Sequence, residues 1–198
     1  YMQYRVMDAT EAYVLCDCTG YRLDGTDTEP NMYVGMIINR SLADTTDSVT
    51  GLGDIHALVN AIGEMRRVAR KAGLVAIKID DIAQVNARFG FDAGDRVLAE
   101  SAACLMDCSR GKGRLFRSTG PMFVALFDDL DPEETDAIAE EIERFLGSPV
   151  LFGSFEYQPP IRVATLHLDA VDRQPVSILN ELKALLEEAP QVPGTKLD

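Results

Sequence analysis

The stretch RLFRSTGPMFVALF, residues 114–127, constrains the fold of this chain more than any other feature of the sequence. Residues 114–117 run into a turn, and residues 123–127 leave it as an apolar strand. A Gly-Pro pair between two such runs is typical of a tight turn between antiparallel strands. The sequence therefore predicts a hairpin, and its turn at Gly120 and Pro121 carries no charge.

Helices and strands alternate around this hairpin. Apolar residues recur at helical spacing from residue 55 to residue 72. Because a hairpin interrupts the alternation, the order predicts an α+β layer fold with a central mixed, largely antiparallel sheet flanked by helices, and not a doubly wound parallel one. The other helices are expected over 81–90, 91–110, 131–147 and 175–189, and the other strands over 73–82 and 149–169.

Several element ends carry local signals. Gly90 is expected to end the short helix that starts near Asp81. Asp92 is predicted to be the N-cap of the longer helix, with Asp95 in its first turn. The end of the chain, QVPGTKLD, is predicted to fray.

Residues 1–46 are predicted to form two or three strands, with a turn at Asp24 and Gly25. Because so few strands bury little surface alone, this part is interpreted as a fragment of another unit or as an attachment to the rest of the chain. The polar stretch 41–54 is predicted to be a linker and then a turn into a helix.

The net charge of −13 argues against partners that are themselves strongly negative. Phosphate backbones need a basic stripe, so a nucleic-acid partner is not expected, and neither is contact with an anionic membrane. No apolar run approaches the roughly 20 residues that cross a bilayer, and no signal peptide is recognised. A cytoplasmic location is therefore expected.

The four cysteines form two pairs, and the members of each pair share a face of their predicted element. Cys16 and Cys18 lie on a predicted strand, and Cys104 and Cys108 lie on a predicted helix. Because the chain has only two histidines, a Zn²⁺ site would need both pairs to converge. Free thiols in a reducing cytoplasm are the simpler interpretation.

Three stretches, taken in order and at their separations, resemble one known family. DSVTGLGD at 47–54 resembles D-x-L-T-G-L-x-N, and IKIDDIAQVNARFGFDAGDRVL at 77–98 resembles I-D-x-D-x-F-K-x-x-N-D-x-x-G-H-x-x-G-D-x-x-L. The hairpin RLFRSTGPMFVAL resembles R-L-G-G-D-E-F-A-x-L. These are motifs of the GGDEF family, the diguanylate cyclases that join two GTP molecules into cyclic di-GMP.

The resemblance covers residue 47 to about residue 190 and implies the nucleotidyl cyclase fold, which has a ferredoxin-like core. Residues 47–192 are then expected to form a degenerate GGDEF domain, and residues 193–198 a tail. Residues 1–46 resemble the last strands of a PAS-type sensor domain with a linker, on the pattern Y-R-V…Y-V-L…Y-V-G-M-I-I.

The chain departs from the family where the family binds metal. In the family, one carboxylate ends the first strand of the domain and another stands third in the signature turn. Here these positions hold Lys78 and Pro121, and the next acidic position holds Met122. Mg²⁺ prefers oxygen ligands, so neither Mg²⁺ nor any other cofactor is expected to bind as in active members. The signature turn of this chain consists of Thr119, Gly120, Pro121, Met122 and Phe123.

Other matched positions have changed as well. The lysine that the family uses on phosphate is Ala83 here, and its usual histidine is Phe91. The product-binding inhibitory motif R-x-x-D keeps Arg110 but has Gly113 in place of the aspartate. The resemblance therefore implies an incomplete inhibitory site.

Two positions match the family pair that contacts guanine, namely Asn86 and Asp95. An amide and a carboxylate suit the donor and acceptor edge of that base. Asp95 could equally favour the positive start of its helix, and Asn86 could be a polar residue on an exposed helix. Lys78 is interpreted either as an ion-pair partner of Asp80 or another carboxylate, or as a point charge that binds a nucleotide phosphate without metal.

Three functions remain open from the sequence. The first is a GGDEF-like signalling domain without cyclase activity, acting as a regulatory, GTP-sensing or dimerisation module in a larger protein. Its expected partners are GTP, a second copy of the chain or neighbouring domains. The second is an active diguanylate cyclase, and the third is a protein-interaction scaffold whose cleft is filled by side chains such as Met122 and Phe91.

Overall fold

The computed structural model describes residues 2–7, 13–23, 32–39, 45–68, 70–109, 111–146, 149–152 and 155–195. The chain divides into two compact units, Tyr1–Thr45 and Thr46–Asp198. The predicted turn at Asp24 and Gly25 and the position of Arg110 lie outside the described residues.

The first unit is a three-stranded antiparallel sheet with the order β1-β2-β3. Its strands are β1 (Met2–Met7), β2 (Tyr13–Leu23) and β3 (Met32–Asn39). The strands predicted in this part of the chain are therefore present, whereas its assignment to a PAS domain stays a prediction. Across the ladder, Val6 faces Val14 and Gly20 faces Gly35.

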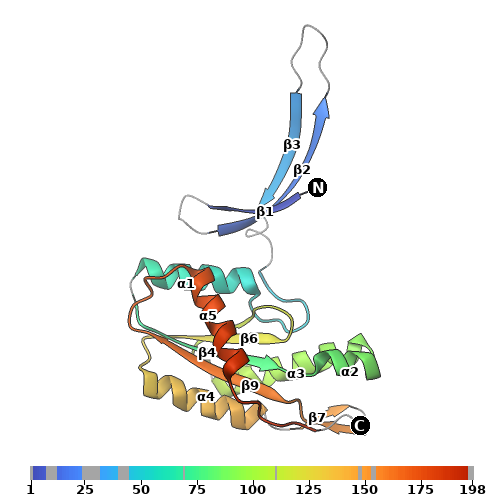
Figure 1. Ribbon diagram of the computed structural model, residues 1–198, viewed down its shortest axis with the longest axis vertical. Coiled ribbons are helices and arrows are strands. Elements are labelled where there is room, and N and C mark those ends of the chain that lie inside the picture. The colour runs from blue at the N-terminus through green and yellow to red at the C-terminus, as the bar shows by residue number, and fades with distance from the viewer. Residues whose placement is uncertain are drawn as a thin grey trace. The chain divides into compact units, whose positions relative to one another are not determined.

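The second unit is built on a four-stranded sheet with the order β5-β6-β4-β9, and every strand pair in it is antiparallel. The predicted α+β class and the antiparallel sheet are confirmed (Figure 1). The strands are β4 (Ala72–Ile79), β5 (Arg114–Arg117), β6 (Met122–Asp128) and β9 (Ile161–Leu168), with a separate pair β7 (Val150–Phe152) and β8 (Phe155–Tyr157). The helices are α1 (Ile55–Arg67), α2 (Ile82–Phe89), α3 (Phe91–Ser109), α4 (Pro132–Leu146) and α5 (Pro175–Glu188).

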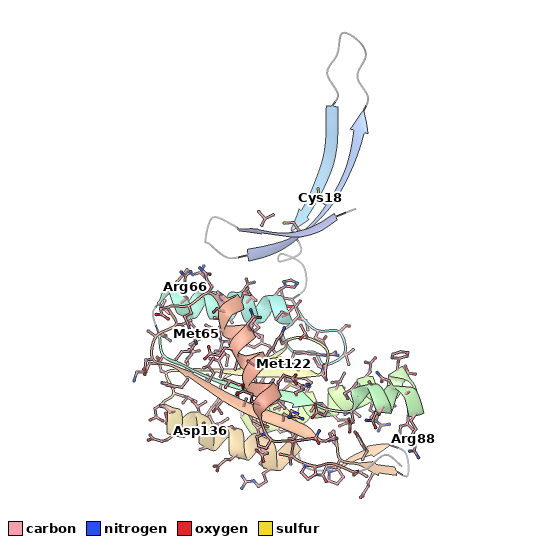
Figure 2. All side chains as sticks on the ribbon, viewed as in Figure 1. Cys18, Met65, Arg66, Arg88, Met122 and Asp136 are labelled. Atoms are coloured by element: carbon pink, nitrogen blue, oxygen red, sulfur yellow. The ribbon has the colours of Figure 1, made fainter. Side chains whose placement is uncertain are left out.

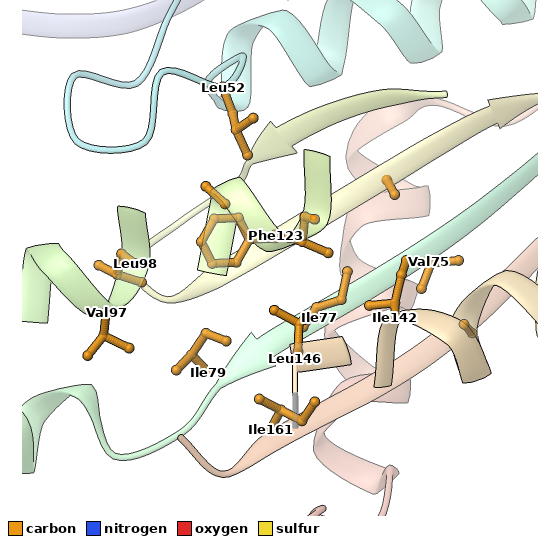
Figure 3. Packing of buried hydrophobic residues seen from close by; sticks show 14 of the residues in the cluster. Leu52, Val75, Ile77, Ile79, Val97, Leu98, Phe123, Ile142, Leu146 and Ile161 are labelled. Atoms are coloured by element: carbon orange, nitrogen blue, oxygen red, sulfur yellow. The ribbon is translucent and has the colours of Figure 1, made fainter. Parts of the chain in front are cut away.

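Both faces of the sheet are covered by helices, because alternate side chains of its strands enter two separate apolar clusters. On β4, Ile77 and Ile79 pack toward α2, α3 and α4, while Leu74 and Ala76 pack toward α1 and α5. Figure 3 shows the first cluster, in which Phe123 of β6 lies among the aliphatic side chains. The sequence of β4 is apolar without alternation because neither face meets water.

The ends of the helices follow from capping. Asp54 is the N-cap of α1, and its side chain accepts hydrogen bonds from the backbone N–H of His56 at 2.8 Å and of Ala57 at 2.9 Å. The helix predicted to reach residue 72 ends at Arg67, because the chain must turn before β4 begins at Ala72.

The predicted N-cap of α3 is wrong. The helix begins at Phe91, so Asp92 lies inside its first turn, where a carboxylate still stabilises the positive end of the helix. Gly90 separates α2 from α3 with φ +88°, and its N–H bonds to the carbonyl of Asn86, as expected for a glycine that ends a helix.

The prediction that the chain end frays is wrong for residues 191–195. Val192 exchanges both backbone hydrogen bonds with Ile161, at 2.8 and 3.2 Å. Farther on, Thr195 donates its N–H to the carbonyl of Gln158 at 2.8 Å, and its hydroxyl oxygen accepts from the N–H of Gln158 at 3.1 Å. The segment after α5 therefore extends the sheet edge at the start of β9, a pairing that no local sequence signal announces.

We predict that Gly73→Ala destabilises the chain by about 1–3 kcal/mol. A Cβ at Gly73 in β4 would lie 2.3 Å from Oγ1 of Thr135, a buried residue of α4. The control is Gly63→Ala in α1, where nothing lies within 4 Å and the gain in helix propensity should stabilise by about 0.5–1 kcal/mol. Urea unfolding measures both, and equal stability of the two variants would contradict this packing of α4 on β4.

Candidate functional site

The signature turn projects from the end of the β5–β6 hairpin. Thr119 and Gly120 are exposed, and Gly120 has φ +56° with nothing near its Cβ position. The turn is closed by two backbone bonds, from Ser118 N–H to the Met122 carbonyl at 2.8 Å and from Met122 N–H to the Thr119 carbonyl at 3.1 Å. Pro121 has no N–H to donate, so the turn offers fewer backbone donors to an anion than a glycine-rich one.

Arg117 connects this turn to the segment that precedes α1. Its Nε donates to the carbonyl of Gly120 at 2.9 Å, and its Nη1 donates to both carboxylate oxygens of Asp47, at 3.0 and 3.2 Å. Thr50 also donates its N–H and its hydroxyl to Asp47, at 2.9 and 2.7 Å. Burial opposes ionisation of Asp47, but the hydrogen bonds from Thr50 and Arg117 outweigh it and lower the pKa of this carboxyl below its ordinary value of 3.8.

Lys78 lies near the end of β4, directly opposite Met122 in the ladder. Its Nζ lies 2.8 Å from Oε1 of Glu187 on α5 and 3.9 Å from Oδ1 of Asp80. The interpretation of Lys78 as an ion-pair partner of Asp80 or another carboxylate is confirmed, and Glu187 is the nearer of the two. Its alternative role toward a nucleotide phosphate stays a prediction.

The second carboxylate oxygen of Asp80 also accepts hydrogen bonds. Oδ2 accepts from Nε of Arg162 at 3.0 Å and from Nε2 of Gln191 at 2.6 Å, and the Asp80 side chain is only 12% exposed. Arg162 in turn donates from Nη1 to the carbonyl of Ala189 at 2.7 Å, at the end of α5. We call Lys78, Asp80, Arg162, Glu187 and Gln191 the strand-end cluster. It joins the end of β4 to β9 and to the end of α5.

The residues at this place do not fit Mg²⁺. The end of β4 and the turn are adjacent, since Ile79 donates its N–H to the carbonyl of Pro121 at 3.0 Å. Yet the two matched positions supply an ammonium and a proline, and the oxygens of Asp80 face the Arg162 guanidinium, the Gln191 amide and the Lys78 ammonium. Among the described residues, no three His, Cys, Asp or Glu side chains are grouped to hold a metal ion.

Asn86 and Asp95 lie on the adjacent helices α2 and α3. The amide oxygen of Asn86 is buried and receives no hydrogen bond in the described part of the chain. A Cβ at Gly94 would lie 1.9 Å from this oxygen, so the glycine makes the space that the Asn86 side chain occupies. Asp95, the next residue, is exposed. The structure therefore brings the two predicted residues to one corner of the unit, with an unsatisfied acceptor beside them.

The two side chains considered as fillers of the cleft behave differently. Met122 is buried, with 5% exposure, and packs in the cluster on the α1 and α5 side of the sheet. Phe91 is 78% exposed and fills nothing. Its neighbour Phe89 is 48% exposed, with the Arg88 guanidinium 5.4 Å from the ring centre.

Gly113, where the resemblance implies an aspartate in the inhibitory motif of the family, has no room for a side chain. Gly113 has φ +80°, and its Cβ would lie 2.5 Å from the ring of Phe127. An aspartate could not stand there without moving that buried ring. A carboxylate at this position is therefore incompatible with the packing of β6.

All four cysteines are free. Burial and the neighbouring Cys104 raise the pKa of Cys108 to about 12, so this thiol stays protonated at neutral pH.

Over the ranges that the structure describes, no helix has both the length and the apolar character needed to cross a bilayer.

Comparison with known proteins gives consistent matches. The family model described as diguanylate cyclase, GGDEF domain, matches residues 44–149. The chain is 29% identical over 113 residues to the cyclic di-GMP phosphodiesterase PdeR of Escherichia coli (strain K12), covering 56% of this chain and 17% of that protein. It is 29% identical over 84 residues to the diguanylate cyclase DgcS of Shewanella oneidensis (strain MR-1), covering 40% of this chain and 28% of that protein.

Among solved structures, the GGDEF domain of FimX from Pseudomonas aeruginosa matches with a TM-score of 0.68 and 17% identity. The match covers 74% of this chain and 94% of that domain, and at this identity it shows the fold alone. The chain spans less than a third of the length of the two curated relatives it matches.

We predict that Asp47→Asn destabilises the chain by about 1.5–3 kcal/mol at pH 7, because Arg117 loses its charged acceptor. The folded-state pKa of Asp47 is lowered, so its contribution is fully present above the unfolded value near 3.8 and is lost as the pH falls through the lower folded value. Urea unfolding from pH 7 to pH 3 should show the difference from the unmodified chain shrinking below about pH 4. Asp107→Asn, on the exposed side of α3, is the control; a pH-independent difference would contradict this role of Asp47.

Proposed function

The chain belongs to the GGDEF domain family, and on that premise we propose that Thr46–Asp198 is a regulatory module without cyclase activity in a longer cyclic di-GMP signalling protein. The observation that carries the proposal is the ion pair between Lys78 and Glu187, which stands where active members are expected to hold a metal carboxylate. The fold is retained while the chemistry at the turn has changed.

The charge at this place argues against phosphoryl transfer. Phosphoryl transfer depends on metal ions that bridge the phosphates and neutralise developing charge. Two unit charges 4 Å apart interact by about 4 kcal/mol at the effective dielectric of a protein surface, so the Lys78 ammonium repels a divalent cation there. Asp80 does not compensate, because it already faces Arg162.

The relatives support a role outside synthesis. A domain of this kind matches both a protein named as a phosphodiesterase and one named as a diguanylate cyclase. A segment similar to this chain is therefore found in a protein whose named activity is the breakdown of cyclic di-GMP. Dimerisation and contact with neighbouring domains stay predictions for this chain.

The Asn86 corner favours a second element of the proposal, the sensing of guanine nucleotides. The unsatisfied oxygen of Asn86, which lies over Gly94, and the exposed carboxylate of Asp95 are two acceptors that suit the N–H donors on the edge of guanine. In this proposal GTP binds through its base, at Asn86 and Asp95.

We predict that the chain makes no cyclic di-GMP from GTP with Mg²⁺ or Mn²⁺, measured by chromatography of the nucleotides against DgcS as a positive control. A triple variant, Lys78→Asp, Pro121→Asp and Met122→Glu, returns carboxylates to the turn, and any synthesis that it shows would tie the loss to these positions. Metal-dependent synthesis by the unmodified chain would overturn the proposal of an inactive domain.

We also predict that calorimetry detects binding of GTP but not of ATP, with an affinity that Mg²⁺ leaves unchanged. Asn86→Ala should weaken GTP binding by about tenfold, because it removes a polar contact to the base. Gln84→Ala, on the exposed side of the same helix, is the matched control. Equal binding of GTP and ATP, or of neither, would remove the sensing element and leave an interaction scaffold.

A further inference from the structure

A small pocket lies between the signature turn and α5. It has a volume of about 250 Å³, several times the roughly 30 Å³ share of one water in the liquid. The turn contributes Pro121 and Met122, β4 contributes Lys78, and α5 contributes Lys183 and Leu186 among its lining residues. The pocket is on the sheet face that carries α1 and α5, whereas Asn86 belongs to the opposite helical layer.

The charges around this pocket do not cancel. Lys78 and Lys183 both line it, and Glu187 is the one carboxylate among its described lining residues. Asp80, the next nearest acid, is matched by Arg162 at 3.0 Å. Lys183 makes no ion pair with any residue that the structure describes. One positive charge is therefore left over in the pocket of a chain whose net charge is −13.

Of the other lining residues, Pro121, Met122 and Leu186 are apolar and Thr119 is polar. Met122, labelled in Figure 2, is 5% exposed and Leu186 is 1% exposed, while Pro121 is partly buried. Surface of this kind favours contact with an apolar group over contact with water. A second negative charge on a ligand would be repelled by Glu187.

We propose that this pocket binds a small monocarboxylic acid with a short apolar body. Its carboxylate lies between Lys183 and Lys78, and its apolar body lies against Met122 and Leu186. Charge-assisted hydrogen bonds of this kind are among the stronger ones in proteins. Bound there, the acid connects the signature turn to α5, so that its presence stabilises the end of α5 against the sheet.

This inference rests on one part of the proposed function, the absence of a metal at the signature turn. A metal bound there would compete with the acid for the same space. The acid belongs to a ligand class other than nucleotides. The two can fail separately, since cyclic di-GMP synthesis tests one and binding of a carboxylic acid tests the other.

The test is a titration of the full chain with benzoate and with hexanoate, observed through ¹³C-labelled methionine methyl groups. Met122→Leu identifies the Met122 signal. We expect a saturable shift of that signal with both acids and no such shift with benzamide, the neutral counterpart of benzoate. A response to benzamide equal to that of benzoate would overturn the proposal, and so would tighter binding of inorganic phosphate than of benzoate.

Three variants make the test specific to the pocket. Lys183→Met should weaken benzoate binding by about tenfold, since it removes one charged donor while keeping an apolar stem. Lys112→Met, an exposed lysine of the loop before β5, should leave binding unchanged. Glu187→Gln should tighten binding, because it removes the carboxylate that competes for Lys78. Benzoate binding that Lys183→Met does not weaken, or that Glu187→Gln does not tighten, would overturn the assignment.

Discussion

Strand β4 runs through the middle of the four-stranded sheet, and its side chains from Leu74 to Ile77 are completely shielded from solvent. A strand buried on both faces cannot carry charged groups along its length without large desolvation costs. Charged side chains of this strand are therefore confined to its end, where Lys78 and Asp80 reach the turn of the β5–β6 hairpin and the end of α5. The place of the site is a consequence of the burial of its central strand.

At that strand end, two arrangements could satisfy the exposed polar groups. A pair of carboxylates could share a divalent cation, or the chain could supply the cation itself. This chain supplies it itself, because Lys78 and Arg162 bring two positive charges to Asp80 and Glu187. These ion pairs connect α5 to the sheet, and Lys183 is a further cation beside the pocket between the turn and α5. The same ion pairs thus stabilise the packing of α5 and fill the strand end with the positive charges of the chain itself.

Local sequence signals predict most of the fold and only part of this site. The spacing of apolar residues in α1, the hairpin turn and Gly90 each report on contacts within a few residues, so the sequence alone reveals them. Glu187 and Gln191 are not revealed in this way, because they lie 109 residues from Lys78 and 111 residues from Asp80 along the chain. Long separation also explains why local signals predict a frayed chain end although Val192 pairs with Ile161. Gly94 is visible in the sequence beside Asp95. That it makes room for the Asn86 side chain could not be predicted, because this contact depends on how α2 packs on α3.

We propose that the strand-end cluster takes the place of a metal, and paramagnetic broadening by Mn²⁺ tests this proposal most directly. Backbone amide spectra of the chain would be recorded as Mn²⁺ is added in substoichiometric amounts, with and without GTP. The account predicts no selective loss of the Ile79 and Asp80 signals relative to exposed acidic residues of α4. Selective, saturable broadening at Ile79 and Asp80 that disappears in Asp80→Asn would show a bound divalent cation there and contradict the account.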